Sequence, residues 1–395
     1  ADVLDPNTPE LYFDLNTFTY NVQYHLPDNN KWKTAVGITG MQQSNKNKAD
    51  EVLIPEYRLF DVGAFVYTQR NYDRFTISGG MRFDNRSIDS KKLTENYATK
   101  FEAFTRSFSN VSGSAGISYE AGKTTTLKFN IARGFRAPGI AELASNGTHE
   151  GTNRYEYGDR HLRSETSLQA DIGTEVNTEH LSLSTTGFVN NIDDFIFYRK
   201  LSNINGGDSL VNVDGEDITA FTFSQAKALL YGAELYIDIH PHPLDWLHVE
   251  NTFSYVRGAF NQPIEGVKNI PFIPAARLIT QLKAEFLKKG KRISNLSITA
   301  ELDNTFRQNK AFTAYSTETP TKGYSLLNAF IGADIMHHKK TLFSIYISGT
   351  NLVNSAYQSH LSRLKYTGVN NVTGREGVYN MGRNFSVKIN VPLMF

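Results

Sequence analysis

The 395-residue sequence contains no cysteine, which excludes disulfide bonds and metal sites built on thiolate ligands. No stretch approaches the roughly 20 consecutive apolar residues that a membrane-spanning helix needs. The formal net charge is only +1, from 41 Lys and Arg against 40 Asp and Glu. The chain therefore lacks the basic excess of a nucleic-acid-binding protein, and nucleic acid is not expected as a partner.

The clearest positive signal is the alternation of the last eleven residues, Phe385 to Phe395. One parity is wholly apolar, whereas the other is mostly polar and includes Lys388. Alternate side chains of a strand lie on opposite faces, so this pattern is typical of a barrel strand with lipid outside and water inside. The mean hydropathy of −0.39 fits a barrel, because half of each strand faces a polar lumen.

The same period of two recurs along the chain, and the connections alternate in length. Short turns alternate with longer polar segments at 44–56, 87–100, 135–163, 200–215, 258–272, 308–323 and 353–381. Short turns on one rim and long loops on the other are typical of outer-membrane barrels, whereas a soluble sandwich would mix the lengths. The sequence thus predicts an all-β fold, a transmembrane antiparallel β-barrel with about 15 strands of roughly 10–16 residues.

The directions of the first and last strands conflict with a closed barrel. The first strand, at about 9–25, leads into a short turn, and the last strand runs toward the same rim. The ends of a closed antiparallel sheet must run in opposite directions, and single-chain bacterial barrels have even strand numbers. Either the count is wrong by one, or strands that precede residue 1 are missing from this chain.

Four groups of residues, in a fixed order, carry a resemblance to a known family. They are Phe135-Arg136-Ala137-Pro138 with Glu142, Leu143, Leu162, Glu165, Ser167, Gly173 and Glu175; Leu230 to Leu235 with Gly232 and Glu234; Gly349 to Asn354 with Asn351, Leu352 and, further on, Tyr357; and Gly382-Arg383-Asn384 before the run to Phe395. Together they resemble the barrel signature of TonB-dependent outer-membrane receptors over residues 130–395, with some similarity to the zinc-uptake and haem receptor branches.

The resemblance implies a barrel of about 22 strands around an N-terminal plug. No plug or TonB-contacting segment is recognisable, so residues 1–395 are interpreted as the C-terminal portion of the barrel. The plug and early strands would then lie on a missing or separate segment. The implied partners are outer-membrane lipid and lipopolysaccharide, the TonB complex through the absent part, and the barrel-assembly machinery through Phe395. The implied location is the bacterial outer membrane, with the long loops extracellular.

The loop after Pro138 is the leading candidate for ligand binding. Its candidate residues, joined by one histidine in the last long loop, are His149, Glu150, Tyr155, Tyr157, Asp159, His161 and His360. Imidazole and carboxylate groups suit zinc or haem iron, so His149 and His161 are also candidate metal ligands. In some haem receptors a histidine follows the Phe-Arg-Ala-Pro box, and His149 would be its counterpart. Solvated loop histidines and an aromatic girdle of tyrosines are the alternatives.

The function implied is active import of a scarce ligand, namely an iron chelate, haem or a metal ion such as zinc. The loops would bind this ligand, and TonB-energised plug movement would admit it without any required cofactor. A passive pore and a barrel scaffold for a surface partner are the alternatives. An enzyme is not expected, because the sequence has neither a Gly-x-Ser-x-Gly elbow nor a His-Glu-x-x-His helix.

Overall fold

The computed structural model describes residues 9, 11–28, 31–49, 51–95, 97–149, 154–213, 215–338 and 340–392, and only the backbone of His149. Fifteen strands form one continuous antiparallel wall. They are β1 (Phe13–His25), β2 (Trp32–Asn47), β3 (Tyr57–Tyr72), β4 (Phe75–Ser90), β7 (Phe104–Glu120), β8 (Thr125–Arg136), β11 (Glu165–Asn177), β12 (Leu181–Lys200), β14 (Glu216–Ile239), β15 (Leu247–Ile264), β17 (Arg277–Phe286), β18 (Ile293–Thr305), β19 (Tyr324–His337), β20 (Lys340–Thr350) and β23 (Asn384–Asn390).

The remaining elements are short and lie in the long loops. They are β5 (Leu93–Glu95), β6 (Ala98–Phe101), α1 (Ile140–Ala144), β9 (Asn146–His149), β10 (Arg154–Tyr157), β13 (Leu210–Val213), β16 (Val267–Asn269), η2 (Ala314–Ser316), η3 (Arg363–Tyr366), β21 (Val369–Asn370) and β22 (Arg375–Glu376). Among the described residues, no helix is long and apolar enough to cross a membrane.

The register of the wall places apolar side chains in continuous rows. Ile77 pairs with Ile117, Ile117 with Phe129, and Phe129 with Ile172, so four neighbouring strands present apolar groups on the same face. These four side chains are 39–67% exposed, although they are apolar. In β23, Phe385, Val387 and Ile389 are exposed in the same way. Such a large apolar exterior requires lipid, and the alternation predicted from the sequence is confirmed.

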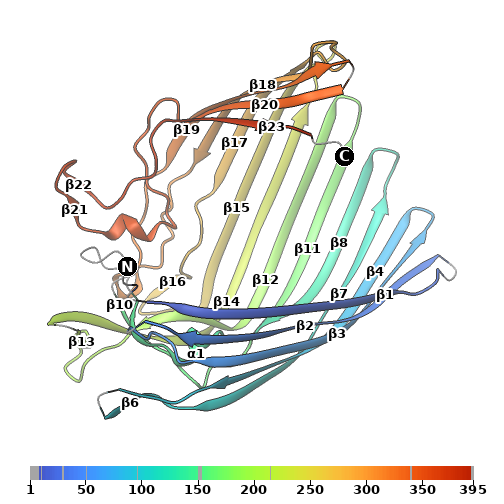
Figure 1. The fold of residues 1–395 in the computed structure, drawn as a ribbon. Coiled ribbons are helices and arrows are strands. Elements are labelled where there is room, and N and C mark those ends of the chain that lie inside the picture. Colours follow the sequence, from blue (N-terminus) through green and yellow to red (C-terminus); the bar gives the residue numbers. More distant parts are fainter. Residues whose placement is uncertain are drawn as a thin grey trace.

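The wall curves from β1 at one edge to β23 at the other (Figure 1). In the part of the chain that the structure describes, no ladder joins these two edges. β1 runs into the short turn before β2, and β23 runs antiparallel to β20, which starts from a short turn. Both edge strands therefore run toward the rim of short turns, as predicted from the sequence. We call this end the short-turn rim and the opposite end the long-loop rim.

The expected strand length of about 10–16 residues is wrong for the middle of the wall, as in β12 with 20 residues and β14 with 24. These strands continue past the wall into the long loops, where β13 forms a hairpin with the start of β14. The projecting hairpin is plain in Figure 1. Backbone groups of a loop that stands clear of the wall still need partners, and a strand extension supplies them.

Two apolar clusters hold the long loops together at their rim. The first contains Tyr57, Leu59, Ile88, Phe108, Ala137, Leu143, Leu162, Ile196 and Phe223. The second contains Phe197, Ala228, Phe260, Ile270, Ile273, Phe312 and Ala314. Each cluster joins strand ends to loop residues from distant parts of the sequence. The buried core of this protein therefore lies at the long-loop rim, and it gives the loops a defined shape.

Candidate ligand-binding site

Arg136, the last residue of β8, anchors the loop that carries most of the predicted site. Its guanidinium donates two hydrogen bonds to Glu165, at 2.7 and 2.8 Å, and two to Glu142, at 2.8 and 2.9 Å. Arg136 and Glu165 are also direct partners in the β8–β11 ladder. Glu142 in turn accepts the backbone N–H of Gly139 at 2.7 Å, at the start of α1. The motif residues at this strand end therefore meet in a structural ion-pair network.

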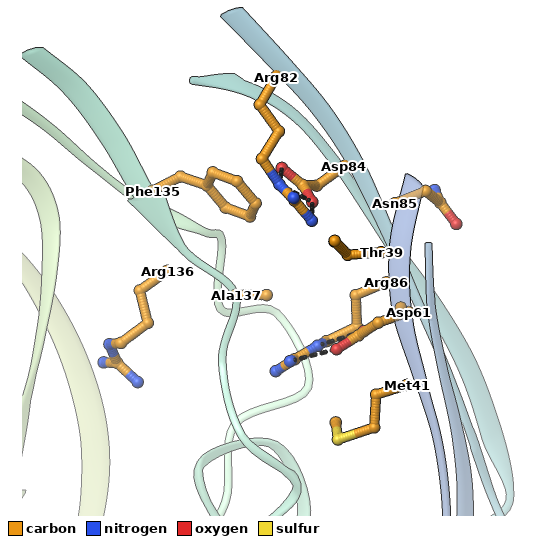
Figure 2. A pocket seen from close by; sticks show the side chains of 11 residues that line it. Thr39, Met41, Asp61, Arg82, Asp84, Asn85, Arg86, Phe135, Arg136 and Ala137 are labelled. Carbon is orange, nitrogen blue, oxygen red and sulfur yellow. Dashed lines mark hydrogen bonds and ion pairs between the residues drawn. The ribbon is translucent and has the colours of Figure 1, made fainter. Parts of the chain in front are cut away.

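A cavity of about 420 Å³ lies between this strand end and the inner faces of β2, β3 and β4. Figure 2 shows Phe135 directed toward the pair of Arg82 and Asp84, with Arg136 pointing away from them. Arg82 donates to Asp84 at 2.6 and 2.8 Å, and Arg86 donates to Asp61 at 2.8 and 2.7 Å. Both guanidiniums are thus neutralised, so the cavity offers hydrogen bonds but little net charge.

The predicted loop residues form a small folded unit beside β14. β9 and β10 make a hairpin, and β10 also pairs in parallel with β14. The Tyr155 hydroxyl donates to the Asn146 side chain at 2.8 Å, and the rings of Tyr155 and Tyr157 lie 4.9 Å apart. Asp159 accepts the backbone N–H of His161 at 2.8 Å. The two tyrosine rings therefore pack against each other at a tilt of 49° in one hairpin, while Asp159 shapes the turn that follows.

The histidines predicted as metal ligands are placed differently from one another. The side chain of His149 and all of Glu150 lie outside the described residues. His161 is exposed, and within the described part of the chain it belongs to no group of three metal-capable side chains. Metal ligation by His149 and His161 stays a prediction.

His360 is 7% exposed and lies in a polar cluster between two long loops. Its Nδ1 is 2.9 Å from Thr321 Oγ1 and 3.4 Å from Lys365 Nζ, and its Nε2 is 3.8 Å from Glu318. Lys365 also donates to Thr321 at 2.8 Å. The ring is therefore packed within the loops, and ligand contact by His360, which stays a prediction, would require them to open.

Glu318 is the hub of this cluster. Its carboxylate accepts the backbone N–H groups of Phe272 at 2.7 Å and Phe312 at 3.0 Å. Burial alone would raise the pKa of Glu318, but the nearby His360 and the hydrogen bonds from the backbone N–H groups of Phe312 and Phe272 outweigh burial and lower it. The ionised carboxylate thus holds three loop segments in a single arrangement.

Two arginines that the sequence analysis did not single out meet at the long-loop rim. The guanidinium of Arg154 lies 4.6 Å from the ring centre of Phe221, and that of Arg363 lies 3.8 Å from that of Phe272. Burial lowers the pKa of Arg154. Burial and then the nearby charge of Arg154 lower the pKa of Arg363. The negative charges of Glu156 and Glu318 act in the opposite direction on the pKa of Arg154, and Glu318 does so on that of Arg363.

These two residues come from loops more than 200 positions apart, so no local pattern could have paired them. The only sequence signal was their position: Arg154 precedes Tyr155, and Arg363 follows His360 by three residues. Tyr198 lies beside Arg154, with its ring centre 5.6 Å from the guanidinium. Two positive charges between aromatic faces can bind an anion that also has an apolar or planar part.

The other motif residues have packing roles. A side chain on Gly232 would meet the backbone oxygen of Tyr255 at 2.3 Å, so β14 requires glycine there. Asn351, which has a φ of 50° and is buried, accepts the N–H of Ser355 at 2.8 Å and shapes the turn after β20. Leu352 donates its N–H to Leu327 at 2.8 Å, and Glu234 is exposed on β14. Phe395 lies outside the described residues.

Comparison with known proteins agrees with this architecture. The family model described as "TonB dependent receptor-like, beta-barrel" matches residues 4–352. The TonB-dependent heme receptor A of Haemophilus influenzae (strain 86-028NP) is 23% identical over 95% of this chain and 53% of its own length.

Solved structures show the same fold at low sequence identity. The copper transporter OprC superposes with a TM-score of 0.75 at 17% identity, over 96% of this chain and 57% of its own. The FrpB iron transporter of Neisseria meningitidis (F3-3 variant) gives a TM-score of 0.66 at 15% identity, over 95% of this chain and 55% of its own. The chain thus spans little more than half the length of these relatives.

Proposed function

This chain belongs to the TonB-dependent receptor family, a family of outer-membrane receptors and transporters, and from that premise we propose that it binds and imports an anionic ligand. The ligand class that the site favours is a ferric chelate or haem, held at the long-loop rim. This rim would face the outside of the cell, and the short-turn rim would face the periplasm. Import would follow TonB-energised movement of a plug.

The observation that carries this proposal is the pair Arg154 and Arg363. Each guanidinium lies against an aromatic ring, and burial lowers the pKa of both arginines even though the carboxylate of Glu318 acts to raise it. A bound anion would add negative charge beside these two half-buried guanidiniums, and hydrogen bonds between arginine and an anionic oxygen are strong and directional. The aromatic rings suit the planar part of a porphyrin or a catecholate. By contrast, the cavity in Figure 2 has its arginines neutralised.

The resemblance and the odd strand number also support a proposal about the whole barrel. Fifteen antiparallel strands place β1 and β23 in the same direction, so these two could close the wall on each other only as a parallel pair. We propose that residues 1–395 form the C-terminal part of the barrel and that further strands and the plug come from another segment. The same segment would contact TonB. The barrel-assembly machinery would recognise the end of the chain at Phe395, and the outer surface would contact lipid and lipopolysaccharide.

Uptake in cells tests the function directly. Cells whose sole route is the full-length receptor are given labelled iron as an anionic chelate, labelled haem, or zinc, with TonB present or deleted. We expect uptake of one anionic iron ligand, and we expect TonB deletion to abolish it. Uptake that persists without TonB would identify a passive pore. No uptake of any ligand, together with a surface protein that co-purifies in constant ratio, would identify a scaffold.

Ligand binding by the purified receptor tests the arginine pair. The Arg154→Gln/Arg363→Gln variant should bind the transported ligand more weakly, by roughly 10- to 150-fold for each charge-assisted contact of about 1.5–3 kcal/mol. Arg375→Gln is the matched control, because Arg375 is an exposed residue of the last long loop whose guanidinium lies over Tyr379. Equal affinity in the double variant, the control and the native receptor would contradict the anionic site.

A further inference from the structure

At the short-turn rim, opposite the long loops, three metal-capable side chains converge. Asp238 ends the inner face of β14, His240 follows in the turn, and His248 lies at the start of β15. One ligand atom from each residue lies within 4.8 Å of the others. His240 Nε2 is 2.7 Å from Asp238 Oδ2, and His248 Nδ1 is 3.2 Å from the same oxygen.

The fold explains why these three residues meet. Asp238 pairs with Glu250 in the β14–β15 ladder, and His248 pairs with Lys283 in the β15–β17 ladder. Since alternate residues of a strand share a face, His248 and Glu250 lie on the same side of β15, next to Asp238. His240 is fixed from outside the hairpin, because its backbone N–H donates to His180 in the neighbouring turn at 2.9 Å.

The cluster is buried and has unused binding capacity. Asp238 is 7% exposed, and its Oδ1 has no hydrogen-bond partner among the described residues. Two imidazoles approach its other oxygen, Oδ2, from different directions, with their rings 4.4 Å apart at 77°. Leaving a buried carboxylate oxygen without a partner is costly, so Oδ1 points to a ligand that this site can bind.

The spacing and chemistry of the donors fit a zinc-like cation. Ligands around a tetrahedral Zn²⁺ with bonds of about 2.0–2.1 Å are about 3.3 Å apart. The 3.2 Å between His248 Nδ1 and Asp238 Oδ2 matches this spacing, and His240 Nε2, at 2.7 Å from the same oxygen, would move outward by about half an ångström. Two imidazoles and one carboxylate, without sulfur, are ligands that Zn²⁺ readily takes, whereas Ca²⁺ and Mg²⁺ prefer an all-oxygen shell. Three protein ligands leave the fourth position for water.

A second layer of charged groups surrounds the cluster. His248 would use Nδ1 toward the metal, and its Nε2 points toward Glu285, whose Oε2 is 3.9 Å away. A carboxylate behind a metal-binding histidine is a common orienting partner. Glu285 is held in turn by Lys283 at 2.6 Å and Lys288 at 3.5 Å. Glu250, the ladder partner of Asp238, adds negative charge that favours a cation.

We propose that Asp238, His240 and His248 form a divalent transition-metal site of the zinc type at the short-turn rim. These three residues lie on the rim opposite the proposed anion site, so the metal site stands or fails independently of the proposed function. The metal would tie the β14–β15 turn to both of its strands at the end of the lumen. It is distinct from the loop histidines 149 and 161, which belong to the opposite rim.

The test uses the full-length receptor in detergent. Bound metal is first removed with a chelator, the receptor is then loaded with Zn²⁺ and desalted, and the number of zinc ions per chain is measured by mass spectrometry. We expect His240→Ala/His248→Ala to retain one zinc fewer per chain than the native receptor. The matched control is His337→Ala/His338→Ala, which removes two exposed histidines from another short turn and should leave the count unchanged. Counting the difference separates this site from any zinc held by the loops.

Two further variants keep the test decisive if the double variant does not assemble. Asp238→Asn keeps the side-chain shape and should also lose the zinc. Glu285→Gln should keep the site but weaken its zinc affinity by about 10- to 100-fold in a competition with a chromophoric chelator. The proposal is overturned if the native receptor and Asp238→Asn retain equal zinc, or if Glu285→Gln leaves the affinity of the native receptor unchanged.

Discussion

Replacing Glu318 by glutamine should loosen the long loops in a measurable way. The carboxylate accepts two backbone N–H groups, those of Phe272 and Phe312, and Glu318 is only 4% exposed. A glutamine side chain has one acceptor oxygen, and its NH₂ group would face a second donor. One buried N–H then loses its partner, which costs about 1–3 kcal/mol.

This cost should appear as easier local opening, because the carboxylate links loops rather than wall strands. Amide hydrogen exchange at Phe272 and Phe312 in the purified receptor should speed up by about 5- to 150-fold, the factor equivalent to 1–3 kcal/mol. Amides in the middle of β3 and β4 should exchange at the native rate. Glu376→Gln, at an exposed acidic residue of the last long loop, is the control.

Unchanged exchange at Phe272 and Phe312 in Glu318→Gln would refute this reasoning, since it would mean that the carboxylate does not hold the loops. Faster exchange throughout the wall would also refute it, because the effect would then be global unfolding. Thr321 and Lys365 contact His360 but not Glu318, so they should keep their mutual hydrogen bond in the variant.

Three further outcomes follow from particular contacts. The pKa of Glu318 lies below its usual 4.5. The stabilisation of the loops by this carboxylate should therefore be complete above about pH 4.5 and should be lost as the pH falls through the lowered pKa, and amide exchange along a pH series would measure it. Phe260→Ala, at a 2% exposed ring between Phe197 and Phe312, should lower the free energy of unfolding by about 3–5 kcal/mol, and equal denaturant midpoints would contradict that packing role. Gly232→Ala should reduce the yield of folded barrel, because the added carbon would lie only 2.3 Å from a backbone oxygen. Gly187→Ala is the control and should assemble normally, because a carbon added there has no neighbour nearer than 3.9 Å.

Much of the wall could be predicted from the sequence because its pattern is local. A strand between lipid and a polar interior must alternate, and residues 385–390 do so in the sequence and in β23. The alternating loop lengths gave the two rims, and counting segments gave the 15 strands that the wall contains. Strand length was less predictable, because β12 and β14 extend into loops whose partner strands no local pattern reveals.

The candidate sites were predictable only in part. The segment around Tyr155 and Tyr157 was identified from its density of polar and aromatic groups, and these residues do share a hairpin at the long-loop rim. His360 was identified as a loop residue of the same rim, but its burial beside Glu318 depends on a segment 42 positions away. The cluster of Asp238, His240 and His248 was missed, since a short turn showed no functional pattern.

By itself, the sequence determined which face of each strand meets lipid, where the chain turns, and on which rim the large loops lie. These properties depend on residues that are one or two positions apart in the chain, so they can be read from the sequence. Only the tertiary structure decided which charges are neutralised and which remain available. Arg82 and Arg86 form ion pairs with carboxylates, whereas Arg154 and Arg363 come from distant loops and lie against the rings of Phe221 and Phe272. Coulomb energy depends on distance in space and on burial, and ladder register and loop packing set both.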